Sequence, residues 1–68
     1  MTIIKAKKDL FNGGKCFTAG ETYTINRSVN SNIDLIDART INDQGQPHII
    51  GGWWKEFNII KNKKSYYK

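Results

Sequence analysis

The sequence predicts one small all-β domain that closes into a barrel. Isoleucine dominates the apolar residues, whereas leucine and alanine, the usual residues of helices, are scarce. Several short runs alternate apolar and polar residues, which is the period of a half-buried strand. With 68 residues the chain has room for a single hydrophobic core and no second folded unit.

The first half of the chain is predicted to hold two strands joined by a long connection. Residues 2–7 start apolar and then alternate, which indicates a strand. Residues 8–15 break this pattern and contain an Asn-Gly-Gly turn signal, so we expect a long loop or an irregular hairpin. Gly20 then marks a tight turn that leads into a second strand at residues 22–25.

After a polar loop, the second half is predicted to begin with a hairpin. Residues 33–41 are read as a strand in preference to a helix, because their apolar residues, among them Ala38 and Ile41, fall into one register if a bulge is allowed. Residues 42–46 form a tight turn. The returning strand is Pro47–Ile50, with the proline at the position where a missing N–H costs least.

A short helical turn and a last strand complete the predicted domain. Gly51 and Gly52 end the hairpin, Trp53–Phe57 has the length of one helical turn, and Asn58–Lys61 can form the closing strand. The domain then covers residues 1–61. Residues 62–68 show no apolar period, so we expect a basic, flexible C-terminal tail.

This order of elements resembles the SH3-like barrel. Residues 17–23, Phe-Thr-Ala-Gly-Glu-Thr-Tyr, are similar to the diverging turn of such barrels, and residues 53–60 lie where they carry a 3₁₀ turn. The resemblance implies a five-stranded SH3-like barrel with one 3₁₀ or helical turn before the last strand. It does not imply polyproline binding, because the A-L-Y-D-Y and P-x-x-Y motifs of peptide-binding SH3 domains are absent.

The chain also resembles a group of small uncharacterised bacteriophage proteins. These proteins combine an F-x-x-G-x-x-Y segment, a D-x-x-G turn within an apolar hairpin, and a W-x-x-F segment near the end. The corresponding residues here are Phe17, Gly20 and Tyr23, then Asn42-Asp43-Gln44-Gly45, then Trp54 and Phe57. This resemblance implies an accessory protein that acts inside an infected bacterium.

Cysteine content and charge limit the classes of protein. Cys16 is the only cysteine, so no internal disulfide can form, and Cys16 with His48 is too few ligands for a closed zinc site. Residues 1–8 lack the apolar segment of a secretion signal, and no apolar run of about 18 residues follows. We therefore expect a cytoplasmic protein without metal or cofactor. Its net charge of +5 favours encounters with phosphates, anionic lipids or acidic proteins, and charge alone does not choose among them.

The residue types give no indication of catalysis. An active site needs a nucleophile with a base, or two carboxylates held a few ångström apart. His48 follows a proline on a strand, which is typical of a packed ring, and Cys16 beside a phenylalanine is typical of a small buried residue. Asp34, Asp37 and Asp43 are too scattered for a calcium loop. We expect that the chain is not an enzyme.

Trp53 and Trp54, followed by Lys55, are the first candidate binding site. Adjacent residues cannot both point into a small core, so we expect one indole to be partly exposed. An exposed tryptophan can anchor a protein interface or stack on a nucleic-acid base. The alternative is that Trp53 covers the open end of the barrel while Trp54 or Phe57 fills it.

Basic residues near both ends of the chain are the second candidate site. They are Lys5, Lys7, Lys8 and Lys15 in one group, and Lys61, Lys63, Lys64 and Lys68 with Tyr66 and Tyr67 in the other. The two groups merge into one patch if the first and last strands pair. Lysines beside aromatic rings suit nucleic acid, although runs of charge are also ordinary solvated surface.

These features support two main hypotheses of function. The first is a small non-enzymatic phage accessory protein that binds and modulates a host protein through Trp53 and Trp54, with the positive charge steering association. The alternative is a small basic barrel that binds DNA or RNA. A structural or assembly role is a third reading, and no membrane partner is expected.

Overall fold

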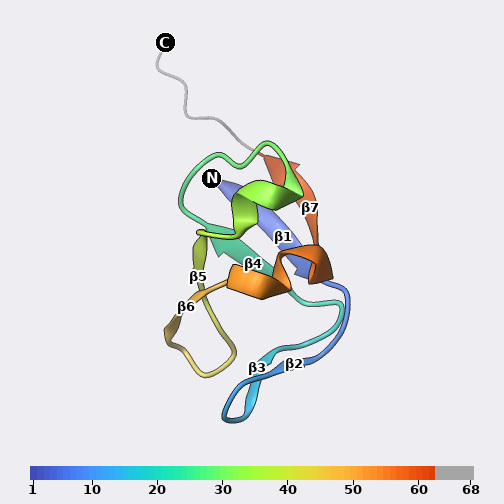
Figure 1. The fold of residues 1–68 in the computed structure, drawn as a ribbon, viewed down its shortest axis with the longest axis vertical. Coiled ribbons are helices and arrows are strands. Elements are labelled where there is room, and N and C mark those ends of the chain that lie inside the picture. The colour runs from blue at the N-terminus through green and yellow to red at the C-terminus, as the bar shows by residue number, and fades with distance from the viewer. Residues whose placement is uncertain (63–68) are drawn as a thin grey trace.

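The computed structural model describes residues 1–62, which form a mainly β structure with two short 3₁₀ turns (Figure 1). The prediction of an all-β protein is confirmed. The elements are β1 (Thr2–Ala6), β2 (Leu10–Phe11), β3 (Lys15–Phe17), β4 (Thr22–Ile25), η1 (Asn32–Leu35), β5 (Arg39–Ile41), β6 (Pro47–Ile49), η2 (Gly51–Glu56) and β7 (Phe57–Asn62).

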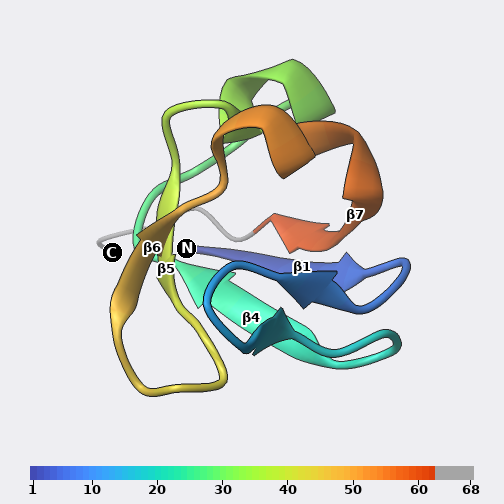
Figure 2. The same ribbon diagram turned by 60° about the horizontal axis from the view of Figure 1, so that its bottom comes forward.

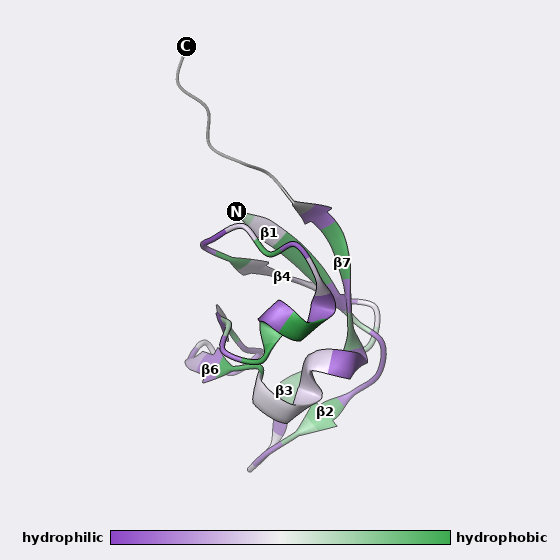
Figure 3. Cartoon of the chain, turned by 45° about the horizontal axis from the view of Figure 1, so that its top comes forward, coloured by the Kyte–Doolittle hydropathy of each residue, from purple (hydrophilic) through white to green (hydrophobic). Residues whose placement is uncertain are grey.

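The largest sheet has the order β4-β1-β7, with both neighbours antiparallel to β1. The alternation of residues in β1 and β4 buries every second side chain, as the sequence predicts. Figure 2 shows the three strands one above another, with the two 3₁₀ turns packed beyond β7. The first and last strands of the described chain therefore lie side by side. In Figure 3, β7 is apolar in its middle and polar where it ends.

The core lies between this sheet, the two hairpins and the 3₁₀ turns. Phe17 occupies its centre and is fully buried. Its ring makes edge-to-face contacts with Tyr23, His48, Trp53 and Phe57, at centroid distances between 4.9 and 5.8 Å. The other fully or almost fully buried apolar residues are Ile4, Ala6, Leu10, Cys16, Ile25, Val29, Leu35, Ala38 and Ile50.

Two hairpins extend from this core. β2 pairs with β3 across the Asn-Gly-Gly turn, so the connection between the first two predicted strands is a hairpin and not a loop. β5 pairs with β6, which confirms the predicted hairpin across residues 42–46. Gly45 has a φ of +78°, a conformation that a side chain would strain, and so closes this turn.

The predicted strand at residues 33–41 is wrong over its first part. Asn32–Leu35 is the 3₁₀ turn η1, and the strand begins only at Arg39. Leu35 and Ala38 are buried, whereas Ile33 and Ile36 are exposed. Burial therefore repeats every three residues, which is the period of a 3₁₀ turn and not of a strand with a bulge.

The predicted number of strands and their closure also differ from the structure. In the described part of the chain, seven short strands form three separate sheets that are not closed into one barrel, whereas five strands in one barrel were expected. Within residues 1–62 no backbone ladder joins β4 to β5; instead the hydroxyl of Thr40 donates a hydrogen bond of 2.7 Å to the carbonyl oxygen of Thr24. This side chain uses an acceptor that a ladder would need.

The end of the described chain follows the prediction for a helical turn and a last strand. η2 lies directly before β7, as predicted, but it spans Gly51–Glu56 in place of residues 53–57. β7 is longer than expected because it begins at Phe57 and continues to Asn62. The rest of the predicted tail, residues 63–68, lies outside the described residues. The helices of residues 1–62 are short 3₁₀ segments, and none has the length and hydropathy needed to cross a membrane.

Candidate functional site

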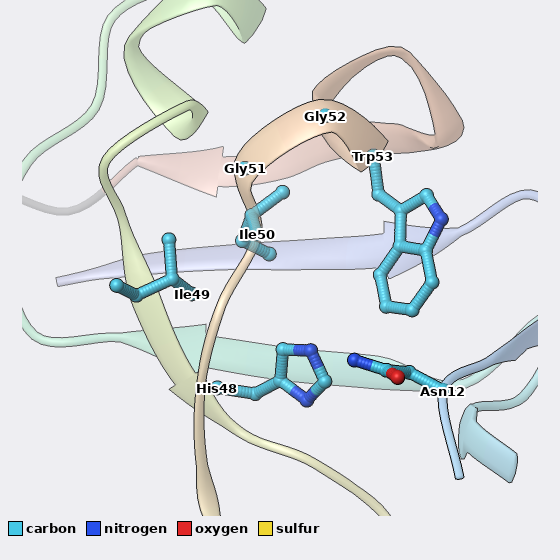
Figure 4. A pocket seen from close by; sticks show the side chains of 7 residues that line it. All are labelled: Asn12, His48, Ile49, Ile50, Gly51, Gly52 and Trp53. Atoms are coloured by element: carbon cyan, nitrogen blue, oxygen red, sulfur yellow. The ribbon is translucent and has the colours of Figure 1, made fainter. Parts of the chain in front are cut away.

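A shallow pocket of about 230 Å³ lies between the turn after β2, the end of β6 and the start of η2. Figure 4 shows the side chains of Asn12, His48 and Trp53 pointing toward one another around it. Ile49 and Ile50 line the apolar side, and two glycines complete the wall. The pocket therefore combines three polar or aromatic side chains with an apolar wall.

Trp53 is held in place by the local backbone and by two rings. The backbone N–H of Trp53 donates a hydrogen bond of 3.1 Å to the carbonyl oxygen of Ile50. Gly51, with a φ of +55°, allows the chain to turn from β6 into η2 at this point. The indole packs edge-on against Phe17, 5.8 Å between centroids, and tilted over His48 at 5.5 Å. It is half-buried, so part of the ring remains available to a ligand.

The turn between β5 and β6 fixes the orientation of His48. The side-chain oxygen of Asn42 accepts hydrogen bonds from the backbone N–H groups of Gln44 and Gln46, at 2.9 and 3.1 Å. The amide nitrogen of Asn42 is therefore the atom that faces His48 Nδ1, at 3.0 Å. Since this amide donates, Nδ1 accepts, and the proton of the neutral ring is on Nε2. A ligand in the pocket meets a hydrogen-bond donor.

A cluster of three polar side chains joins this turn to the turn before β4. The carboxylate of Asp43 accepts hydrogen bonds from the hydroxyls of Thr18 (2.6 Å) and Tyr23 (2.7 Å). These two bonds, with Thr18 the larger effect, lower the pKa of Asp43. Burial, followed by the hydrogen bond to Asp43, raises the pKa of Tyr23 to about 12. The cluster holds the β5–β6 hairpin, and with it His48, against the core.

Trp54 and Lys55 lie next to the pocket but do not line it. Both indoles are half-buried and pack against the core, so the expectation that one is partly exposed holds for each of them. A 3₁₀ turn rotates successive side chains by about 120°, which lets two adjacent rings lie along the same edge of a core. The ammonium of Lys55 lies 5.3 Å from the ring centroid of Trp54.

The predicted basic group splits in the structure. Lys5 and Lys61 lie on the outer face of β4-β1-β7, brought together by the pairing of β1 with β7. Lys7 follows β1 and is exposed. The ammonium of Lys8 lies 3.6 Å from a carboxylate oxygen of Glu56. The ammonium of Lys15, on the β2–β3 hairpin, lies 3.7 Å from a carboxylate oxygen of Asp9. Five members of the predicted site lie outside the described residues, namely Lys63, Lys64, Tyr66, Tyr67 and Lys68.

Of the residues that line the pocket, the sequence predicts only Trp53 as a binding residue; those it missed are Asn12, His48, Ile49, Ile50, Gly51 and Gly52. Asn12 belongs to the Asn-Gly-Gly turn signal, which predicts a turn and gives no indication of a binding site. No local signal shows that two turns 40 positions apart line the same pocket, since this depends on the packing of Trp53 in η2 against Phe17 in β3. The glycine pair next to Trp53 is the one feature that indicates an open approach to the indole.

The pocket is suited to recognition. It offers the Nε2–H donor of His48, the amide of Asn12 and the face of an indole, which are groups that orient a ligand. Among residues 1–62 no cluster of three or more His, Cys, Asp or Glu could hold a metal ion. No protein-family model matches the chain, and no curated protein or solved structure matches it either.

Proposed function

We propose that this chain is a non-enzymatic binding module that recognises a protein through the pocket beside Trp53. The observation that carries the proposal is a half-buried indole at the wall of an open pocket, next to two residues without side chains. Tryptophans in this setting contribute much of the binding energy of protein interfaces. His48 and Asn12 supply the polar groups that give such an interface its orientation.

The proposed fold is an SH3-like barrel, and the proposed setting is a bacterium infected by the phage that encodes the chain. The fold proposal is supported by the order of the elements and by the contact of Thr40 with Thr24, which brings β5 close to β4. The setting rests on the phage-like segments around Phe17 and Phe57. The partner is then a host protein of the cytoplasm.

A variant at Gly52 tests the pocket without touching the core. A Cβ at this position meets no atom within 4 Å and the backbone φ is not left-handed, so Gly52→Gln should fold normally and fill the pocket. The immobilised protein would be used to capture partners from a bacterial lysate. We expect wild type and a Lys5→Gln, Lys61→Gln control to retain the same proteins and Gly52→Gln to lose them. Identical capture by all three would contradict the proposal.

The outer face of β4-β1-β7 supports nucleic-acid binding as a second candidate function. The register of the sheet places Lys5 between Thr22 and Asn58, and places Lys61 across from Ile3. This face combines two ammonium groups with hydroxyl and amide side chains and carries no carboxylate of its own. Such groups bind phosphates and sugar hydroxyls without reading sequence.

Salt dependence separates the two functions. Phosphate contacts make the logarithm of the association constant fall linearly with the logarithm of the salt concentration, by about 0.7 to 0.9 per contact. A gel-shift titration with mixed DNA and RNA should therefore show a slope that is smaller by about 1.5 in the Lys5→Gln, Lys61→Gln variant. Absence of binding at low salt would remove this candidate. The Gly52→Gln variant should not change the slope.

A further inference from the structure

The two-stranded sheet β5–β6 turns its apolar side chains toward solvent. Arg39 lies opposite Ile49, and Ile41 opposite Pro47, so these four side chains share the outer surface, here called the hairpin face. Ile41 is 54% and Ile49 49% exposed, whereas Thr40 on the inner surface is 5% exposed. Figure 2 shows the hairpin on the outer side of the molecule.

This orientation is the reverse of the one that stability alone favours. A two-stranded sheet beside a core gains most when isoleucine faces inward and threonine faces water. Here Thr40 is buried with its hydroxyl bonded to the Thr24 carbonyl oxygen, and Ile41 and Ile49 are outside. Adjoining exposed apolar side chains on a small domain are typical of an interaction surface.

Two hollows border the hairpin face. One, of about 480 Å³, is lined by Arg39, Pro47, His48 and Ile49, and the other, of about 160 Å³, lies between β4 and β5. Arg39 and Pro47 line both hollows, which therefore adjoin along these two residues. His48 and Ile49 also line the pocket beside Trp53, so the hairpin face is continuous with it.

The free edge of β6 is poorly suited to pairing with another strand. β6 neighbours only β5 in its sheet. Because the N–H of Ile50 donates to the Ala38 carbonyl oxygen, the alternation of the ladder leaves the backbone groups of Pro47 and Ile49 facing outward. Proline has no N–H, so an added strand would find one donor along β6. A partner would therefore bind the side chains of the hairpin face.

We propose that the hairpin face docks an apolar segment of an acidic partner protein, with a carboxylate of that segment paired to Arg39. The inference rests on the proposed protein-binding function and specifies the chemistry of the partner. Arg39 is the single charge of the hairpin face and forms no ion pair within residues 1–62. A guanidinium between apolar side chains binds a carboxylate strongly because little water competes.

Charge and area argue against the other occupants. A second copy would bring a net charge of +5 against +5, and the segment after Asn62 carries Lys63, Lys64 and Lys68 with no acidic residue. A stable dimer buries about 800 Å² on each partner. The accessible surface of the chain is 4555 Å², and four partly exposed side chains offer only a few hundred Å² of it. A short partner segment of negative charge avoids the repulsion between positive charges and fits the small area of the hairpin face.

Selection of short random peptides on the immobilised full-length chain tests the proposal. We expect enriched peptides to combine Asp or Glu with Ile, Leu or Val. Their affinity, measured by titration calorimetry, should fall at least about tenfold with Arg39→Glu and several-fold with Ile41→Thr or Ile49→Thr. These three residues are exposed and threonine keeps the β-branched shape, so the variants should fold. Gly52→Gln should change the affinity by less than about twofold.

Each other outcome overturns the proposal. A selection that enriches no peptide would overturn it. So would enriched peptides that lack acidic residues and whose affinity does not change with Arg39→Glu. Peptides whose binding is lost only with Gly52→Gln would contradict docking on the hairpin face and support binding at the Trp53 pocket. Failure of this inference and failure of the proposed function are therefore distinguishable. Sedimentation equilibrium of the free chain should show a monomer. A dimer that Ile41→Thr dissociates would identify a second copy as the occupant.

Discussion

Thr2 shows how a polar side chain comes to be fully buried in a core this small. Its hydroxyl donates a hydrogen bond of 2.8 Å to the carbonyl oxygen of Arg27 and accepts one of 2.9 Å from the N–H of Val29. These backbone groups belong to the loop after β4, where no strand pairs with them. One threonine thus replaces two ladder hydrogen bonds and fixes the loop on the first strand.

Replacing this hydroxyl should destabilise the protein. Thr2→Val keeps the shape of the side chain but leaves a buried N–H and a carbonyl oxygen without the bonds they form now, so we expect a loss of about 2 kcal/mol in the free energy of unfolding. Urea denaturation measures this change. Thr24→Val, at an exposed position of β4, is the matched control and should stay within about 0.5 kcal/mol of wild type. Equal midpoints for the two variants would contradict the role of the hydroxyl.

The side of a strand on which a residue lies was the hardest feature to predict. The sequence places Ala38 and Ile41 in one register, yet Ala38 is buried and Ile41 is 54% exposed. Residues three apart in a strand lie on opposite faces, and Thr40 takes the inner position because its hydroxyl finds an acceptor there. Hydrophobicity alone therefore assigns the wrong face to this hairpin.

Among the elements, two turns that are distant in sequence act as one unit. Asp43 accepts hydrogen bonds from Thr18 and Tyr23, and its own N–H donates to the carbonyl oxygen of Cys16 at 2.8 Å. The turn before β4 contains Gly20, whose φ of +84° would strain any other residue. The turn before β4 and the turn between β5 and β6 are thereby joined, although no backbone ladder connects their strands.

The joined turns predict a dependence of stability on pH. The pKa of Asp43 is lowered in the folded chain, so its contribution is fully present above the ordinary carboxyl value of about 4 and is lost as pH falls through the lower folded value. Asp43→Asn should therefore lower the thermal midpoint at pH 7 and differ less from wild type near pH 2. Melting curves across this range test it, with Asp34→Asn as the control for charge. A constant difference at all pH values would contradict the prediction.

Elements with a local signal could be predicted from the sequence, and those that depend on packing could not. β1 and β4 alternate in burial, and the length of Trp53–Phe57 between a glycine pair and an apolar run indicates the 3₁₀ turn η2. η1 was missed because a bulge in a strand and a period of three residues both place Leu35 and Ala38 inside. The pocket was missed because Asn12 and Gly52 line one pocket only in the folded chain, where Trp53 of η2 packs against Phe17 of β3.

At the scale of the whole molecule, stability depends on a single aromatic centre. A domain of this size without a disulfide or metal has a free energy of unfolding of about 3 to 5 kcal/mol. Phe17 contacts the rings of Tyr23 and Phe57 in the core and those of His48 and Trp53 at the pocket. The candidate site is therefore built directly on the core, and a change at Phe17 reaches both.

Truncating this centre should unfold the protein. Phe17→Ala removes a fully buried ring at a cost of about 3 to 5 kcal/mol, which equals the whole expected stability, so circular dichroism at 25 °C should show a largely unfolded chain. Phe17→Leu loses less volume and should remain folded with a lower thermal midpoint. Because the leucine no longer supports the rings at the pocket, the fluorescence of Trp53 should also shift toward that of a hydrated indole. A folded Phe17→Ala chain with an unchanged midpoint would show that the core does not depend on this ring.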